Sequence, residues 1–127
     1  MSHLSDLTDA LLTAALNAGA EDADAIATDG VSQSIEVLGG ALEHAERAEG
    51  SEIGLRVLSG KRQACVSASD TKPDTMREMA ERAVAMAKQA PEDAHIGLAE
   101  ASDVTSDTDA SALALYEAAE ETSPATL

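Results

Sequence analysis

Three histidines are the side chains in this sequence best suited to bind a catalytic metal ion. His3, His44 and His95 lie far apart along the chain, and none of them is followed by Glu. A hydrolytic zinc site needs two or three ligands that converge on one ion, with one position left open for water. Because the sequence has no His-Glu pair, the zinc motifs HExxH and HExxxH are both absent. We therefore interpret each histidine as a solvated or structural residue.

Cys65 is the single cysteine, so the chain cannot form an internal disulfide. It lies in the apolar run Ala64-Cys65-Val66, where we expect a small buried hydrophobic residue. A cysteine nucleophile needs a neighbouring base to activate it, and the sequence offers no obvious candidate. We do not predict a catalytic role for this thiol.

Carboxylates are abundant, and we interpret their close pairs as solvated charge rather than as acid/base pairs. The pairs are Asp22 with Asp24, Asp107 with Asp109, and Glu120 with Glu121. The run from Asp103 to Asp109 lacks the loop glycine and the closing Glu of an EF-hand. No GxGxxG, Walker A or GxSxG motif is present. The sequence therefore predicts no catalytic, cofactor-binding or metal-binding residues.

The charge of the chain is strongly negative and unevenly distributed. The formal net charge is −16, and residues 1–46 and 89–127 contain no Lys or Arg. Two acidic ends oppose direct binding to nucleic acid or to an anionic membrane. We interpret the charge as a source of solubility, with a salt-tolerant lifestyle or a cationic partner as alternatives. No signal-like start and no run of membrane-spanning length is present, so we expect a cytoplasmic protein.

Two segments have the periodicity of amphipathic helices. Residues 4–18 repeat apolar side chains at helical spacing, with Ser2 or Ser5 available as a cap and Gly19 as the terminator. Residues 73–90 begin at Pro73, which suits a first helical turn. Their predicted buried stripe comprises Met76, Met79, Ala80, Ala83, Met86, Ala87 and Ala90. We expect both helices to pack on the core.

The period changes to two between these helices, which indicates strands. Residues 24–38 alternate apolar and polar side chains up to Gly39-Gly40, and residues 52–69 form a hairpin around Ser59-Gly60-Lys61. Residues 41–49 are ambiguous, because their composition favours a helix whereas their position between two strands also allows an edge strand.

The chain after Pro91 is acidic and only weakly patterned. Its apolar residues are concentrated at Leu113–Tyr116, and Ser123-Pro124 is typical of a helix start, here followed by no helix body. The residues alone leave open a natural tail or a helix that has been cut. We predict a domain over residues 1–100, followed over residues 101–127 by an acidic linker and the start of a further element.

A family resemblance comes from the order of these features. The segment Gly54–Asp70, GLRVLSGKRQACVSASD, resembles the G-x-R-V hairpin of TldD/PmbA proteins, and the Pro73 helix resembles the next element of that family. Pro91–Ala99 is more similar to PmbA (TldE)-type members than to TldD-type members. Three residues depart from the family pattern, namely Ala64 for a frequent Gly, Cys65 for an aromatic or small residue, and Lys72 for a Ser cap.

The resemblance implies an α+β fold, with a mainly antiparallel sheet of about four strands packed against two helices and an irregular acidic C-terminal segment. It favours a strand at residues 41–49 and a cut helix at Ser123-Pro124. It also implies a cytoplasmic TldD–PmbA heterodimer, also named modulator of DNA gyrase, that processes or degrades unfolded peptides. The zinc motif HExxxH of that family belongs to the TldD-type partner, so we expect no cofactor in this fragment.

Two functions follow from these observations. The first is a non-catalytic N-terminal domain of a PmbA (TldE)-like protease subunit, which would line the chamber or dock the partner or the peptide. The alternative is a freestanding acidic protein-interaction module whose complexes would be sensitive to salt. The resemblance favours the first.

Overall fold

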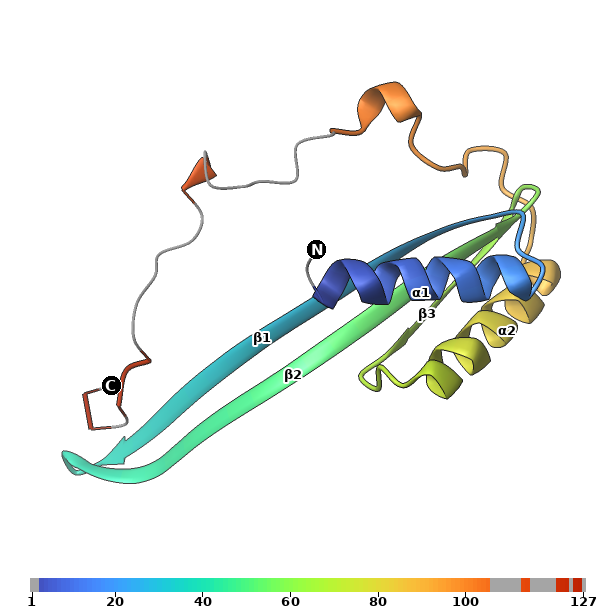
Figure 1. Cartoon of the computed structure of the whole chain (residues 1–127). Coiled ribbons are helices and arrows are strands. Elements are labelled where there is room, and N and C mark those ends of the chain that lie inside the picture. Colours follow the sequence, from blue (N-terminus) through green and yellow to red (C-terminus); the bar gives the residue numbers. More distant parts are fainter. Residues whose placement is uncertain (1–2, 106–112, 115–120, 124, 127) are drawn as a thin grey trace. The chain divides into compact units, whose positions relative to one another are not determined.

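The fold combines two helices with an antiparallel sheet of three strands, as a computed structural model shows (Figure 1). The structure describes residues 3–105, 113–114, 121–123 and 125–126. The elements, in chain order, are α1 (His3–Asn17), β1 (Asp22–Leu38), β2 (Ala41–Ser59), β3 (Arg62–Ala68), α2 (Pro73–Gln89) and the short 3-10 helix η1 (Ala101–Asp103). The predicted α+β class is confirmed.

The chain divides into two compact units. The first comprises Met1–Val31 and Glu49–Leu98, and the second comprises Ser32–Ala48 and Ala99–Leu127. Both helices and β3 belong to the first unit, whereas β1 and β2 contribute residues to both units. The domain boundary expected near residue 100 stays a prediction.

The sheet has three strands rather than about four, because residues 41–49 and 52–59 form one continuous strand. The predicted strand at 41–49 is correct, and Gly50 does not interrupt it because this glycine is itself extended. The reversal occurs instead at Gly39 and Gly40, whose φ angles are 61° and 80°. Two successive residues with positive φ match the tight hairpin turn that suits twisted strands. Pairing with β1 thus overrides the helical composition of this segment.

The second hairpin has the predicted turn. β2 pairs with β3 antiparallel from Ile53 opposite Ala68 to Ser59 opposite Arg62. Gly60 lies in the turn with a φ of 62°, a conformation that glycine adopts without steric cost. The register places Arg56 opposite Cys65, so these two side chains share one face of the sheet.

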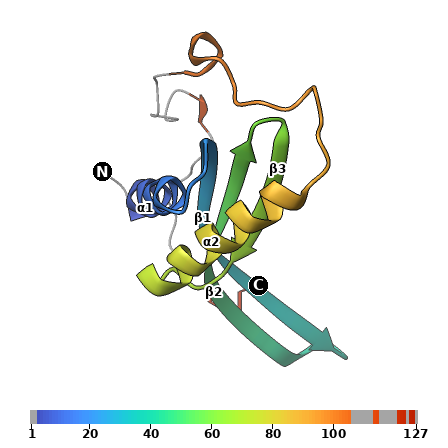
Figure 2. The ribbon, with the colours of Figure 1, turned by 90° about the vertical axis from the view of Figure 1, so that its right-hand side faces the viewer.

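Both helices cover one face of the sheet in the first unit (Figure 2). α1 buries Leu7, Leu11 and Ala15, whereas Leu16, which lies within the helix predicted over residues 4–18, is 58% exposed. The helix begins at His3, so Ser5 lies inside it rather than at a cap, and Ser2 is outside the described residues. Gly19, with a φ of 105°, follows the helix end as predicted.

α2 confirms most of its predicted buried stripe. There are two exceptions: Met86 is 45% exposed, and Ala90 follows the helix end and is only partly buried. Val84 is buried although it was not part of the predicted stripe. At about 100° per residue, Val84 and Met86 flank the stripe on opposite sides. Only the side of the stripe that carries Val84 lies against the core. Sequence periodicity cannot identify which of the two sides is buried.

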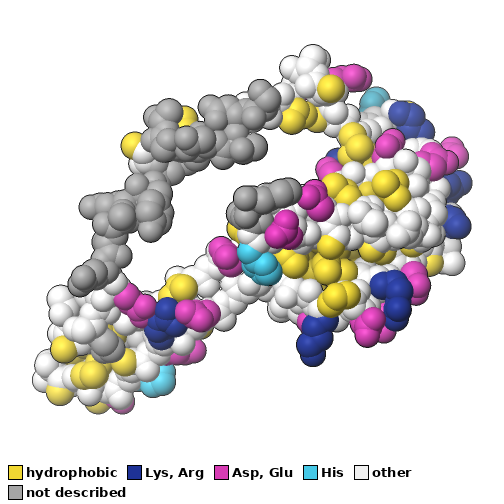
Figure 3. All heavy atoms as spheres, viewed as in Figure 1, with side chains coloured by type: hydrophobic (Ala, Val, Ile, Leu, Met, Phe, Trp, Pro, Cys, Tyr) yellow, Lys and Arg dark blue, Asp and Glu magenta, His cyan; other side chains and the backbone are white. Residues whose placement is uncertain are grey.

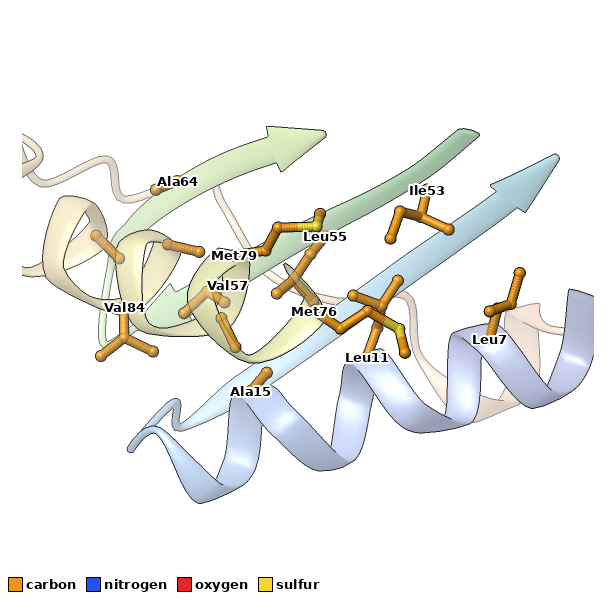
Figure 4. Close-up of a cluster of buried hydrophobic side chains, with 13 residues drawn as sticks. Leu7, Leu11, Ala15, Ile53, Leu55, Val57, Ala64, Met76, Met79 and Val84 are labelled. Atoms are coloured by element: carbon orange, nitrogen blue, oxygen red, sulfur yellow. The ribbon is translucent and has the colours of Figure 1, made fainter. Parts of the chain in front are cut away.

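The core is built from aliphatic and methionine side chains (Figure 4). Ile53, Leu55 and Val57 on β2 are at most 2% exposed and lie under Leu11 of α1 and Met79 of α2. From β1, the core receives only the small side chains of Ala23, Ala25 and Ala27, which are partly buried. The strongest contribution to stability therefore comes from the middle strand and the two helices.

Replacing Leu55 by Ala should lower the free energy of unfolding by about 2–5 kcal/mol, because it removes buried methyl groups and leaves a cavity. Urea denaturation of the 127-residue chain measures this loss. Leu16→Ala, which truncates the same side chain at a position 58% exposed, is the control and should cost far less. Equal losses in the two variants would contradict the assignment of the core.

The start of α2 is fixed by Asp70 rather than by a side chain at Lys72. One Asp70 oxygen accepts a hydrogen bond from the Lys72 backbone N–H at 2.9 Å, and the other accepts from Thr75 Oγ1 at 2.8 Å. Lys72 itself makes no side-chain cap bond. The Lys72 N–H and then the Thr75 hydroxyl lower the pKa of Asp70 below its usual value, because both bonds favour the charged carboxylate.

Asp70→Asn should destabilise the chain at pH 7 and weaken its response to acid. A carboxylate with a lowered pKa in the folded state contributes stability above its unfolded pKa, about 3.9, and loses it as the pH falls through the folded value. The urea midpoints of wild type and variant should therefore differ at pH 7 and converge below about pH 4. Parallel curves across this range would contradict the role of the carboxylate.

The segment after α2 is tied to the β2–β3 turn. The backbone N–H of Asp93 donates to the Lys61 carbonyl at 2.8 Å, and the guanidinium of Arg62 donates to the carbonyl of Ala90. Beyond residue 98 the described residues contain no helix or strand other than η1. Much of Leu113–Tyr116, together with Pro124 of the expected helix start, lies outside the described residues.

Candidate functional site

The face of the sheet opposite the helices carries the polar side chains with defined geometry. Alternation along β2 directs Ile53, Leu55 and Val57 to the core and therefore directs Gly54 and Arg56 to the other face. We call this face in the first unit the open face. The residues of β1, β2 and β3 that form this face include Asp24, Ile26, Gly54, Arg56, Cys65 and Ser67.

A bidentate ion pair joins β1 to β2 on the open face. Arg56 Nε donates to Asp24 Oδ1 at 2.9 Å, and Arg56 Nη2 donates to Asp24 Oδ2 at 2.6 Å. The Asp24 hydrogen bond raises the pKa of Arg56 above its usual value, against a smaller opposing effect of burial. The Asp24 and Arg56 side chains are 51% and 30% exposed, so solvent screens the pair. Two parallel bonds nevertheless fix the orientation of the guanidinium.

Gly54 has a steric role next to this ion pair. A Cβ atom at this position would lie 3.0 Å from Cγ2 of Ile26 on the neighbouring strand. The missing side chain thus leaves room for Ile26, which remains 63% exposed on the open face. The Gly-x-Arg element of the hairpin therefore has two functions, one steric at Gly54 and one electrostatic at Arg56.

The open face is hollowed around these residues, with a cavity volume of about 410 Å³. Cys65 lines the hollow and is exposed, so the prediction that it is buried is wrong. The strand register explains the difference, because Ala64 is the buried neighbour and Cys65 alternates to the opposite side. Sequence reasoning placed Cys65 by the hydrophobicity of its neighbours, which cannot identify the inward-facing residue.

The histidines do not assemble into a metal site within the described part of the chain. His3 lies in α1, His44 lies in β2 beside Glu46 at 3.7 Å, and His95 follows α2. Among the described residues, no group of three His, Cys, Asp or Glu side chains could hold a metal ion. These residues therefore do not fit a zinc centre.

The residues that give the open face its geometry were partly missed by sequence reasoning. Asp24 was interpreted as solvated charge, although on β1 it forms an ion pair with Arg56 on the neighbouring strand β2. The Gly-x-Arg spacing was recognised, and its alternation could have indicated that Arg56 faces away from the core. The partner carboxylate, however, lies 32 residues earlier in the chain. The arrangement is suited to non-covalent recognition, since the hollow offers a fixed guanidinium, small polar groups and one exposed isoleucine.

Charged side chains are distributed asymmetrically in the first unit as well. On the face drawn in Figure 3, the Lys and Arg side chains of this unit gather over α2 and the β2–β3 turn. β1, by contrast, contains no Lys or Arg. None of the helices among the described residues has both the length and the apolar character needed to span a bilayer.

The middle of the chain matches a known protein family. Residues 23–87, just over half of the sequence, match the family described as PmbA/TldA metallopeptidase domain 1. This range begins in β1, contains the whole of the open face and ends within α2. No curated protein matches the chain significantly.

Two solved structures share the fold. A modulator of DNA gyrase from Bacteroides thetaiotaomicron has a TM-score of 0.73 and 15% sequence identity, over 83% of this chain and 24% of its own length. TldE from Thermococcus kodakarensis has a TM-score of 0.61 and 22% identity, over 74% of this chain and 21% of its own length. This chain thus spans about a quarter or less of the length of these structures.

The Asp24–Arg56 pair should show a measurable coupling energy. Single and double Ala substitutions at the two positions should give a coupling of about 0.5–1 kcal/mol in urea denaturation, the upper part of the range for exposed pairs, because the contact is bidentate. The coupling should shrink at 1 M NaCl, where screening is strong. A coupling of zero at low salt would contradict a stabilising role for the ion pair.

Proposed function

This chain belongs to the PmbA/TldD metallopeptidase family, and on that premise we propose that it forms the N-terminal domain of a PmbA (TldE)-type subunit. The observation that carries the proposal is the match of residues 23–87 to the first domain of the family. The fold shared with TldE supports the subunit type, as does the resemblance of Pro91–Ala99 to PmbA-type members. Because the chain covers so little of its structural relatives, the activity of the whole protein belongs to this proposal.

Within such a protein this domain would be non-catalytic and would dock the partner subunit or the peptide. The described residues contain no group suited to hold zinc, and the sequence contains no His-Glu pair. Proteolysis of unfolded peptides would therefore depend on a TldD-type partner that supplies the metal. The open face gives the domain a surface suited to recognition, built on the Asp24–Arg56 pair. We place the assembled protein in the cytoplasm.

The proposal predicts that peptide cleavage requires two different subunits. The full-length parent of this chain, the TldD-type protein of the same organism, and their mixture would each be assayed for cleavage of an unfolded peptide and for bound zinc. We expect cleavage only in the mixture, with the zinc in the TldD-type protein. Size-exclusion chromatography should show a complex that contains both chains.

Two results would contradict this function. If the parent alone binds zinc and cleaves the peptide, it is a catalytic TldD-type subunit. If the two proteins neither associate nor cleave together, the alternative of an acidic protein-interaction module is favoured. A TldD-type protein whose zinc-motif glutamate is replaced by Gln serves as the control, since it should associate with the parent without cleaving.

A further inference from the structure

The two edges of the sheet differ in their protection against pairing with another strand. β3 forms one edge and spans only seven residues, with Lys61 and Arg62 at its start. The segment after α2 is attached at the turn that precedes β3, through the bond from the Asp93 N–H to the Lys61 carbonyl. Short length, cationic side chains and a covering segment are means by which edge strands avoid unwanted pairing.

β1 forms the other edge and has none of these three protections. It spans 17 residues and contains no Pro, Lys or Arg. We restrict the argument to Asp22–Val31, which lies in the first unit, and call it the β1 edge. Among the described residues, β2 is the only strand paired with it, and no described loop or helix hydrogen-bonds to its backbone. Outward-pointing N–H and C=O groups are therefore available along this edge.

The side chains of the β1 edge indicate which strand could pair with it. Asp22 and Asp29 are exposed, and neither forms an ion pair with a described cation. Alternation places Asp22 and Ile26, which is 63% exposed, on the open face, whereas Asp29 lies on the opposite face of the strand. An incoming strand with a cationic side chain on each face and one apolar side chain beside Ile26 would match these positions.

Charge also opposes a second copy of this chain as the occupant. Pairing of two β1 edges would bring together two strands that each carry aspartates and no cations. The net charge of −16 adds a general repulsion between copies. The same aspartates that discourage self-association would attract a cationic strand.

We infer that the β1 edge binds an extended cationic segment of another polypeptide, which joins the sheet as a fourth strand. Backbone hydrogen bonds to Asp22–Val31 hold the segment, while Asp22 and Asp29 select its Lys or Arg side chains. This inference deepens the docking role proposed above and rests on it for the claim that an extended polypeptide reaches this domain. It adds the location, the pairing mode and the charge of the segment.

The test uses the 127-residue chain and a fluorescent ten-residue peptide of Val and Thr that carries two Lys residues seven positions apart, and therefore on opposite faces of the extended strand. Fluorescence anisotropy at low salt compares it with the same peptide N-methylated throughout, which keeps the charge but cannot donate backbone hydrogen bonds. We expect the unmodified peptide to bind at least tenfold more tightly. Hydrogen exchange should slow for amides within residues 22–31.

Matched variants test the role of the two aspartates. The double variant Asp22→Asn with Asp29→Asn should weaken peptide binding about two- to tenfold, as expected for two exposed charge pairs. Glu78→Gln with Glu81→Gln removes the same charge from exposed positions on α2 and should weaken binding less than twofold. Comparable urea midpoints for the two double variants would show that both remain folded.

Three outcomes would overturn the inference. If the N-methylated peptide bound as tightly as the unmodified peptide, binding would depend on charge attraction and not on backbone hydrogen bonds. Slowed exchange confined to other segments would place the peptide elsewhere, and a homodimer of this chain that excludes the peptide would make a second copy the occupant. Because no TldD-type partner is present in this experiment, its failure leaves the subunit assay unaffected, and failure of that assay leaves this one interpretable.

Discussion

The alternation of side chains along β2 determines which residues of the sheet face the core and which face away from it. This alternation is fixed because every second side chain of β2 is buried under the two helices. Ile53, Leu55 and Val57 are at most 2% exposed, and they occupy every second position of the strand. Their burial forces Gly54 and Arg56 to the opposite face, since a slip of one residue would exchange the two sets. The antiparallel register then places Cys65 opposite Arg56, on the same face. The hydrophobic core thus determines which residues the open face presents.

The hydrophobic core contains no aromatic side chain. From β1, only small aliphatic side chains pack against it. Ala23, Ala25 and Ala27 fill the helix-covered side of β1, whereas Ile26 faces outward across Gly54. β1 is therefore held to β2 largely by backbone pairing and by the Asp24–Arg56 ion pair. A strand with few side-chain contacts to the core, whose outer edge pairs with no other described strand, is well placed to gain a further strand from a partner.

The difference between the two edges of the sheet fits the proposal that this domain belongs to a larger assembly. The β3 edge is short, carries cations and is attached to the chain that follows α2. The β1 edge is long and acidic, and among the described residues it pairs with β2 alone. Such asymmetry directs association to one side of the sheet. It is compatible with a family member that works with a partner subunit and extended peptides, as proposed.

The sequence by itself determined the α+β class, the two helices, the Gly60 hairpin turn and the family, because these depend on local periodicity, turn residues and the order of motifs. The sequence alone could not decide whether residues 41–49 form a strand, since that depends on pairing with β1. Nor could it place Cys65 and Met86 at the surface, because hydrophobicity does not identify which flank of a strand or helix meets the core. Only the tertiary structure brought Asp24 to Arg56, since that contact spans 32 residues and requires the strands to be aligned.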